Sequence, residues 1–249
     1  MVFPQVGEAV GVWRGSGPRG KGGRGSSESN AERAGRRART KVRRYCVANG
    51  LDRLASFTYN EEGEGRATSA AQVMADLADF MKRLRAVFGP QAEVHMPEPH
   101  KDGVHWHGHM AIGSYIPQKL LEELWGKGFV HIKRFKNVRT RDGRKVPPVQ
   151  AVAGYVAKYV GKTFETGTGV EFGRHRYECA QGFQPEAVVV SANSLEGFQR
   201  RVSAEVGARV VVVWSSDKKE DWRGPPVVML RWNLAESRKA AAEKASMAA

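Results

Sequence analysis

The residues best suited to chemistry in this chain are two tyrosines, each followed three positions later by a lysine. They are Tyr155 with Lys158 and Tyr159 with Lys162. Residues three or four positions apart share one face of a helix, so both phenols and both amines would lie together. A phenol oxygen can attack a phosphodiester and become covalently joined to one end of a DNA strand. Because a phenol ionises only at about pH 10 in water, attack at neutral pH needs a nearby cation or metal.

A candidate metal site lies upstream of the tyrosines. His105, Trp106 and His107 form a repeat of histidine, bulky apolar residue, histidine. On a β-strand alternate side chains point the same way, so His105 and His107 would face one side and Trp106 the other. Glu98 precedes a Lys-Asp-Gly turn signal, and a hairpin there would place its carboxylate beside the two imidazoles. The pattern predicts a metal held by His105, His107 and Glu98, with open positions for a phosphate oxygen.

Two further histidines leave the third ligand open. His109 continues the alternation and can replace Glu98, and His100 can approach from the turn. Each motif taken alone also has a structural explanation, because tyrosines often pack against a sheet and single histidines are often solvated. The histidine pair and the tyrosine pair in this order together favour a catalytic interpretation.

This combination resembles the HUH endonucleases (histidine, hydrophobe, histidine), and among them the two-tyrosine replication initiator (Rep) proteins of rolling-circle plasmids and single-stranded DNA phages. The resemblance spans roughly residues 51–185 and includes two weaker stretches. Residues 54–59 form an apolar run that ends in threonine and tyrosine, and residues 125–128 read Trp-Gly-Lys-Gly. The resemblance implies an RRM-like palm, a Mg²⁺ or Mn²⁺ cofactor on the histidines, and a tyrosine that nicks single-stranded DNA to form a 5′-phosphotyrosine.

The implied function is initiation of rolling-circle DNA replication by metal-dependent, site-specific nicking and joining of single-stranded DNA at an origin hairpin. Tyr155 and Tyr159 would be the catalytic nucleophiles, and Lys158 and Lys162 would bind the nucleic acid. The sequence has no Gly-x-x-x-x-Gly-Lys-Ser/Thr phosphate loop, so a host helicase and polymerase are expected partners.

Three alternatives stay open at this point. A two-tyrosine transposase or a conjugative relaxase can use the same chemistry. A non-catalytic DNA- or RNA-binding module can keep the same fold. A His/His/Glu zinc hydrolase is a third alternative, although the helical His-Glu-x-x-His spacing is absent.

Composition agrees with a nucleic-acid partner. The 249 residues carry a net charge of +14, and binding to phosphates should therefore weaken steeply with salt. Charge alone fits an RNA-binding protein equally well. The start of the chain does not resemble a secretion signal and no apolar run is long enough to span a membrane, so we expect a cytoplasmic protein without membrane contact. Cys46 and Cys179 are expected to be free thiols.

Hydrophobic periodicity predicts the elements that must position these residues. The expected fold is α+β, with an antiparallel sheet of about five strands, helices packed on it, and the histidines in a central strand facing the tyrosine helix. The predicted order is β, α, β, β, α, β, α, with strands near residues 51–59, 92–96, 104–112 and 129–134 and a long helix near residues 68–87.

The domain organisation is predicted from shifts in composition. Residues 1–33 are rich in Arg, Gly and Ser and are expected to form a disordered basic tail. Residues 34–190 would form the nicking and joining domain, 191–234 a helix with a hairpin, and 235–249 a frayed tail. Residues 33–48 are expected to form a basic helix on DNA or, as we favour, a flexible segment with non-specific affinity.

Overall fold

The computed structural model describes residues 1–12, 27–60, 65–139, 143, 145–165, 176–218 and 226–248. The chain divides into two compact units, of which the larger is Arg24–Gln184. The smaller combines Met1–Gly23 with Pro185–Ala249. Each unit contains its own antiparallel sheet with helices packed on it, which confirms the predicted α+β class. Among the described residues, no helix has both the length and the apolar character that crossing a membrane requires.

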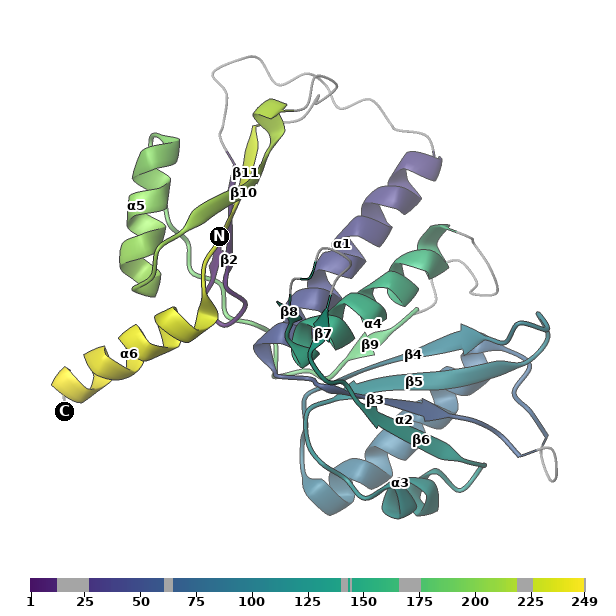
Figure 1. The fold of residues 1–249 in the computed structure, drawn as a ribbon. Coiled ribbons are helices and arrows are strands. Elements are labelled where there is room, and N and C mark those ends of the chain that lie inside the picture. Colours follow the sequence, from purple (N-terminus) through teal and green to yellow (C-terminus); the bar gives the residue numbers. More distant parts are fainter. Residues whose placement is uncertain are drawn as a thin grey trace. The chain divides into compact units, whose positions relative to one another are not determined.

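The larger unit is built on a five-stranded antiparallel sheet with the strand order β6-β3-β5-β4-β9 (Figure 1). The strand number and the order of the main elements agree with the sequence prediction. The five strands are β3 (Arg53–Phe57), β4 (Glu93–Pro99), β5 (Trp106–Ile112), β6 (Val130–Arg134) and β9 (Glu178–Cys179). A two-stranded hairpin, β7 (Val138–Arg139) and β8 (Lys145–Val146), follows β6 along the chain.

Helices cover both faces of this sheet. The helices α2 (Ala70–Phe88) and α3 (Gln118–Trp125) lie on one face, and α1 (Ser27–Ala48) and α4 (Pro148–Glu165) lie on the other (Figure 1). The alternation of β5 separates the two environments, because Met110 belongs to the core with α2 and α3 while the His109 ring lies 6.2 Å from the Tyr159 ring on α4. The histidine strand therefore faces the tyrosine helix, as predicted.

The core beneath the sheet comes from the apolar stripe of α2. Its members recur every three or four positions, and all are buried. The Phe57 ring on β3 lies 4.8 Å from that of Phe80 and 5.1 Å from that of Trp125, both in edge-to-face contact. The stripe consists of Val73, Leu77, Phe80, Met81 and Leu84. Burying each of these side chains contributes roughly 2 kcal/mol, which fixes α2 against the strands that carry the site.

The arginine-rich segment is a folded helix, and the prediction of a flexible tail that reaches position 33 and a loose basic segment beyond it is wrong for α1. Ala38, Val42 and Tyr45 are buried, and the Tyr45 hydroxyl donates to the Ala180 carbonyl at 3.0 Å. The helix packs closely along α4, where a Cβ at Gly161 would collide with the Arg39 side chain. The many arginines conceal apolar residues at helical spacing, and it is these that attach α1 to the unit.

The first twelve residues also depart from the predicted disorder. β1 (Val2–Phe3) and β2 (Glu8–Val12) join β11 (Val227–Arg231) and β10 (Val211–Ser215) in a four-stranded antiparallel sheet with the order β1-β2-β11-β10. Val2 and Ala9 are fully buried in the core that this sheet forms with α5 (Leu195–Val206). Residues 13–26, which were also predicted to be disordered, lie outside the described residues.

The helix and hairpin predicted for residues 191–234 are therefore one part of a unit that the N-terminal strands complete. The last helix, α6 (Leu234–Ala248), occupies the region for which a frayed end was predicted. Local composition could not reveal this unit, because the paired strands β2 and β11 lie more than two hundred positions apart in the chain.

Tyr59 links the end of β3 to α2. Its hydroxyl donates to Asp76 Oδ2 at 2.8 Å, and Lys127 Nζ lies 3.2 Å from Asp76 Oδ1. Burial raises the pKa of the Tyr59 phenol, and the hydrogen bond to the Asp76 carboxylate raises it further. The phenol therefore stays protonated in the folded protein at a pH at which it would ionise in the unfolded chain.

We expect Tyr59→Phe to lower the free energy of unfolding by about 1 kcal/mol at neutral pH, because Asp76 loses a hydrogen bond. A pKa that is raised on folding contributes stability below the unfolded value of about 10 and loses it as the pH rises further. The difference between wild type and variant should thus shrink above that pH in urea unfolding curves. Tyr115→Phe, at a position 75% exposed, is the control. A difference that stays constant at high pH would contradict the assignment.

Candidate active site

The β4–β5 hairpin sets the positions of three potential metal ligands. Glu98 on β4 pairs directly with His107 on β5, and His109 follows on the same face two residues later. The turn closes through a 2.7 Å hydrogen bond from the His100 N–H to the His105 carbonyl, with Gly103 at a φ of 73°. The register therefore brings one carboxylate and two imidazoles together on the face of the sheet that α4 covers.

The ligand atoms of these three residues converge on one point. His107 Nε2 lies 2.9 Å from His109 Nε2 and 3.3 Å from Glu98 Oε2, and the distance from His109 Nε2 to Glu98 Oε2 is 2.5 Å. Neighbouring ligands that each lie about 2.1 Å from an octahedral ion are roughly 3.0 Å apart, so the spacing fits such an ion. Within the described part of the chain, Glu98, His107 and His109 are the group of three that could hold a metal.

Glu98 carries the negative charge that a cation needs. Burial alone would raise the pKa of this carboxyl group, but hydrogen bonds with His107 and His109 outweigh burial and lower the pKa to about 2. Glu98 is therefore ionised at neutral pH. An ionised carboxylate with two imidazoles is a donor set that suits a divalent ion.

His105, which was predicted to be a ligand, lies outside this cluster. Its Nδ1 is 2.7 Å from Asp102 Oδ2, and its backbone N–H donates to Asp102 Oδ1 at 3.0 Å. Strand β5 begins only at Trp106, so His105 belongs to the turn and does not share the alternation of the strand. Of the residues considered for the third position, Glu98 and His109 both lie in the cluster. The His100 ring packs against His107, with 4.4 Å between the ring centroids.

Two small residues support the geometry of the cluster. Gly108, between the two ligating histidines, faces Leu77 of α2, and a Cβ there would lie 3.0 Å from Leu77 Cδ1. Glycine thus permits close packing of the histidine strand on α2. Ser56 on β3 pairs with His109, and its hydroxyl lies 3.0 Å from His109 Nδ1. This hydrogen bond orients the ring so that Nε2 points toward Glu98 and His107.

Ser56→Ala is expected to weaken Mn²⁺ binding by about tenfold, because His109 loses the partner that orients its ring. Titration calorimetry with the purified full-length protein measures the effect directly. Ser114→Ala, at an exposed position, is the matched control and should leave the affinity unchanged. Equal affinities for the Ser56 variant and the wild type would show that the serine does not position the ligand.

The two tyrosines of α4 lie beside the cluster. Their ring centroids are 4.6 Å apart, and Tyr159 is the one whose ring approaches His109. Tyr155 lines an open cleft of about 530 Å³ together with Glu98, His107 and His109. The opposite side of α4 is buried through Val152, Val156 and Val160. Amphipathic packing of the helix thus directs both phenols toward the potential metal ligands.

The surroundings of Tyr155 keep its phenol protonated. Burial raises the pKa of Tyr155, and the hydrogen bond with Tyr159 and the negative charge of Glu98 raise it further. Positive charge at the cleft is therefore required before the oxygen can act as a nucleophile at neutral pH. Lys158 is exposed on the same helix, and Lys162 belongs to α4 but its side chain lies outside the described ones.

The fold and the site together define an α+β domain with a cluster of metal-ligand type beside two tyrosines. Residues 52–164 match the family of ORF2-type replication-associated proteins. This part of the chain therefore belongs to that family, which is consistent with a rolling-circle Rep protein and implies DNA as the partner. The match extends from the start of β3 to nearly the end of α4 and contains the whole cluster and both tyrosines. Comparisons with curated proteins and with solved structures gave no match.

Proposed function

We propose that this replication-associated protein initiates rolling-circle replication by nicking and rejoining single-stranded DNA at an origin hairpin. The observation that carries the proposal is the position of Tyr155 in one cleft with Glu98, His107 and His109. The family of residues 52–164 supports a role in replication. The cleft supports phosphodiester chemistry, since it combines a candidate nucleophile with residues that can bind a cation.

We assign the metal ligands to Glu98, His107 and His109, in place of the set with His105 that the sequence suggested. Their spacing and the ionised carboxylate fit Mg²⁺ or Mn²⁺. Such an ion, when bound, polarises the scissile phosphate and offsets the negative charge that builds up on it. The rigid hairpin holds the three side chains in place before any substrate arrives.

Tyr155 would carry out the first transfer. Its phenol oxygen attacks phosphorus in line with the 3′ oxygen, so that a tyrosine–phosphate bond forms and the bond from phosphorus to the 3′ oxygen breaks. The phenol gives up its proton and the leaving 3′ oxygen gains one, which yields a 5′-phosphotyrosine and a free 3′-hydroxyl. That hydroxyl would prime a host polymerase, with a host helicase separating the strands.

The remaining residues of α4 would complete the cycle. Tyr159, next to Tyr155, can cleave the regenerated origin in a second transfer, after which the free 3′-hydroxyl attacks the first phosphotyrosine and closes the circle. Lys158 and Lys162 would bind the phosphates that flank the scissile bond. Two nucleophiles on one helix allow both transfers without release of the DNA.

The proposal is tested with labelled single-stranded oligonucleotides from the DNA around the gene, incubated with the protein and Mn²⁺ or Mg²⁺. We expect a covalent protein–DNA adduct on a denaturing gel that disappears with a chelator and in the Tyr155→Phe/Tyr159→Phe double variant. Tight binding without an adduct under either metal would refute nicking and favour the binding module.

A further inference from the structure

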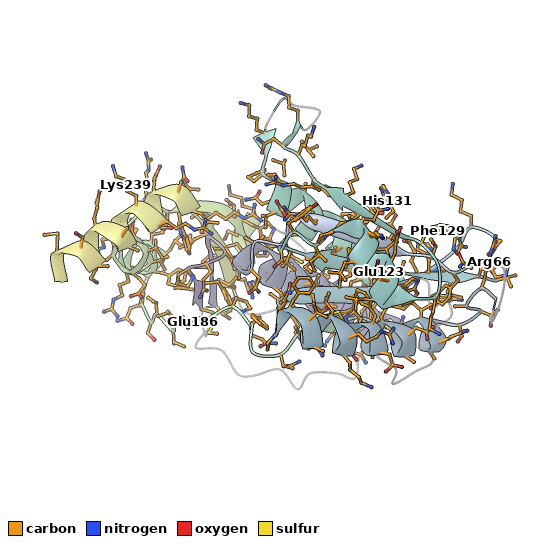
Figure 2. The ribbon with its side chains drawn as sticks, turned by 90° about the horizontal axis from the view of Figure 1, so that it is seen from below. Arg66, Glu123, Phe129, His131, Glu186 and Lys239 are labelled. Carbon is orange, nitrogen blue, oxygen red and sulfur yellow. The ribbon has the colours of Figure 1, made fainter. Side chains whose placement is uncertain are left out.

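We propose that the edge strand β6 carries a binding track for single-stranded DNA, formed by Phe129, His131 and Lys133, which we call the β6 track. The inference rests on the proposed function, because it names the surface that would hold the strand next to the cleft. Strand β6 lies at the end of the sheet order, so the track occupies an edge of the sheet. Figure 2 labels Phe129 and His131 at the outside of the larger unit.

The alternation of β6 decides where these side chains point. Val130 is buried in the core with α2 and α3, and Ile132 packs against that core. Phe129, His131 and Lys133 occupy the alternate positions and therefore point to the other face, which is also the face of the metal-ligand cluster. All three are exposed, and Phe129 is 70% exposed although it is large and apolar.

The register aligns the track with the cluster. His131 pairs with Ser56, which in turn pairs with His109, so the three residues form one row across β6, β3 and β5. Because neighbouring strands are about 4.8 Å apart, the backbone of His131 lies roughly 10 Å from that of His109. A DNA strand whose scissile phosphate occupies the cleft would thus reach the track within a few nucleotides.

The glycine-rich stretch before β6 holds Phe129 in this position. Trp125 Nε1 donates to the Thr58 carbonyl at 2.9 Å, and both the N–H and the hydroxyl of Thr58 donate to the Phe129 carbonyl, at 2.9 and 3.0 Å. Gly128 approaches the Thr58 carbonyl so closely that a Cβ would collide with it. The Trp-Gly-Lys-Gly stretch of the sequence therefore fixes the strand start and exposes the phenyl ring.

The chemistry of the track fits unpaired nucleotides. Exposed aromatic rings and imidazoles stack on bases, and lysines neutralise phosphates. Strand β6 contains no acidic residue, and Lys136, Arg139 and Lys145, which follow it, are exposed and extend the positive charge. Bases in a duplex are already stacked on one another, so the track should select single strands. Because every base has an aromatic face, it should select them with little regard to sequence.

The test measures DNA binding separately from cleavage. Fluorescence anisotropy with the full-length Tyr155→Phe/Tyr159→Phe protein in a chelator reports binding of a labelled single-stranded oligonucleotide and of the matching duplex. In this background we expect Phe129→Ala to weaken single-strand binding by about tenfold and Phe129→Trp to retain it. Lys133→Ala should lower the slope of affinity against salt by about one ion. Tyr115→Ala removes an exposed aromatic ring beyond the other end of β5 and is the matched control.

The outcomes separate this inference from the proposed function. An adduct with the wild-type protein, combined with equal binding by Phe129→Ala and Tyr115→Ala, would overturn the β6 track while nicking stands. Loss of binding in Phe129→Ala, with rescue by Phe129→Trp and no adduct from the wild type, would establish the track and refute nicking. The tryptophan variant also shows that a loss in the alanine variant does not come from misfolding.

Discussion

His109→Ala and His107→Ala should each reduce metal-dependent adduct formation by at least about 100-fold, whereas His105→Ala should retain most of the activity. Each of the first two substitutions removes one of the three atoms that converge in the cluster. The third removes a ring that is hydrogen-bonded to Asp102 in the turn. The three variants differ by two positions along one segment, so they test the register of the hairpin as well as the identity of the ligands.

Binding and folding controls make this comparison decisive. Calorimetry should show that Mn²⁺ binding is lost with His107→Ala and His109→Ala and preserved with His105→Ala, while circular dichroism shows that all three variants are folded. If His105→Ala abolished binding as completely as His109→Ala, the pair of His105 and His107 inferred from sequence would be the correct one. The ligand set assigned from the structure would then be wrong.

The difference between those two ligand sets shows how far local patterns reach. Period-two alternation predicted a histidine strand facing the tyrosine helix, and the structure has this arrangement. Alternation does not say where the strand begins, and the Asp102 side chain binds the first histidine into the turn. A usable signal was present in the apolar run Met110–Ile112, which directly follows His109 and belongs to the strand. Counting the alternation back from this run selects His109 and His107.

Other features depend on pairing between distant segments and were not visible in sequence. Ser56 becomes the partner of His109 only because β3 lies beside β5, fifty-three positions along the chain. The N-terminal strands find their partner in β11, and α1 finds its partner in α4. Composition predicts whether a segment can fold alone, and these segments are ordered by neighbours that composition does not identify.

The packing of α1 on α4 bears on catalysis because it limits how the tyrosine helix can move. Gly161 allows the Arg39 side chain to lie against α4, and Gly35 lets α1 approach Phe164 on the next turn. The opposite side of α4 carries Tyr155 and Tyr159. A nucleophile on a helix that is held in this way approaches the cleft in a restricted geometry, which favours in-line attack.

The two tyrosines should therefore have different roles that single substitutions can separate. Tyr155 lines the cleft with the cluster, so Tyr155→Phe should lower the first cleavage by roughly 1000-fold or more. Tyr159→Phe removes the hydroxyl that hydrogen-bonds with Tyr155, and it should slow the first cleavage by only about tenfold. Tyr159→Phe should, however, abolish the second transfer, because the remaining tyrosine is already occupied by DNA.

A two-step assay distinguishes these roles. A suicide oligonucleotide whose 3′ fragment stays attached as the adduct reports the first cleavage, and adding a second origin strand reports transfer to the other tyrosine. Tyr115→Phe, which lies away from α4, controls for the loss of a phenol elsewhere. If Tyr155→Phe formed the first adduct at the wild-type rate and Tyr159→Phe formed none, the order of attack would be reversed. Tyr159, whose ring lies next to His109, would then be the first nucleophile.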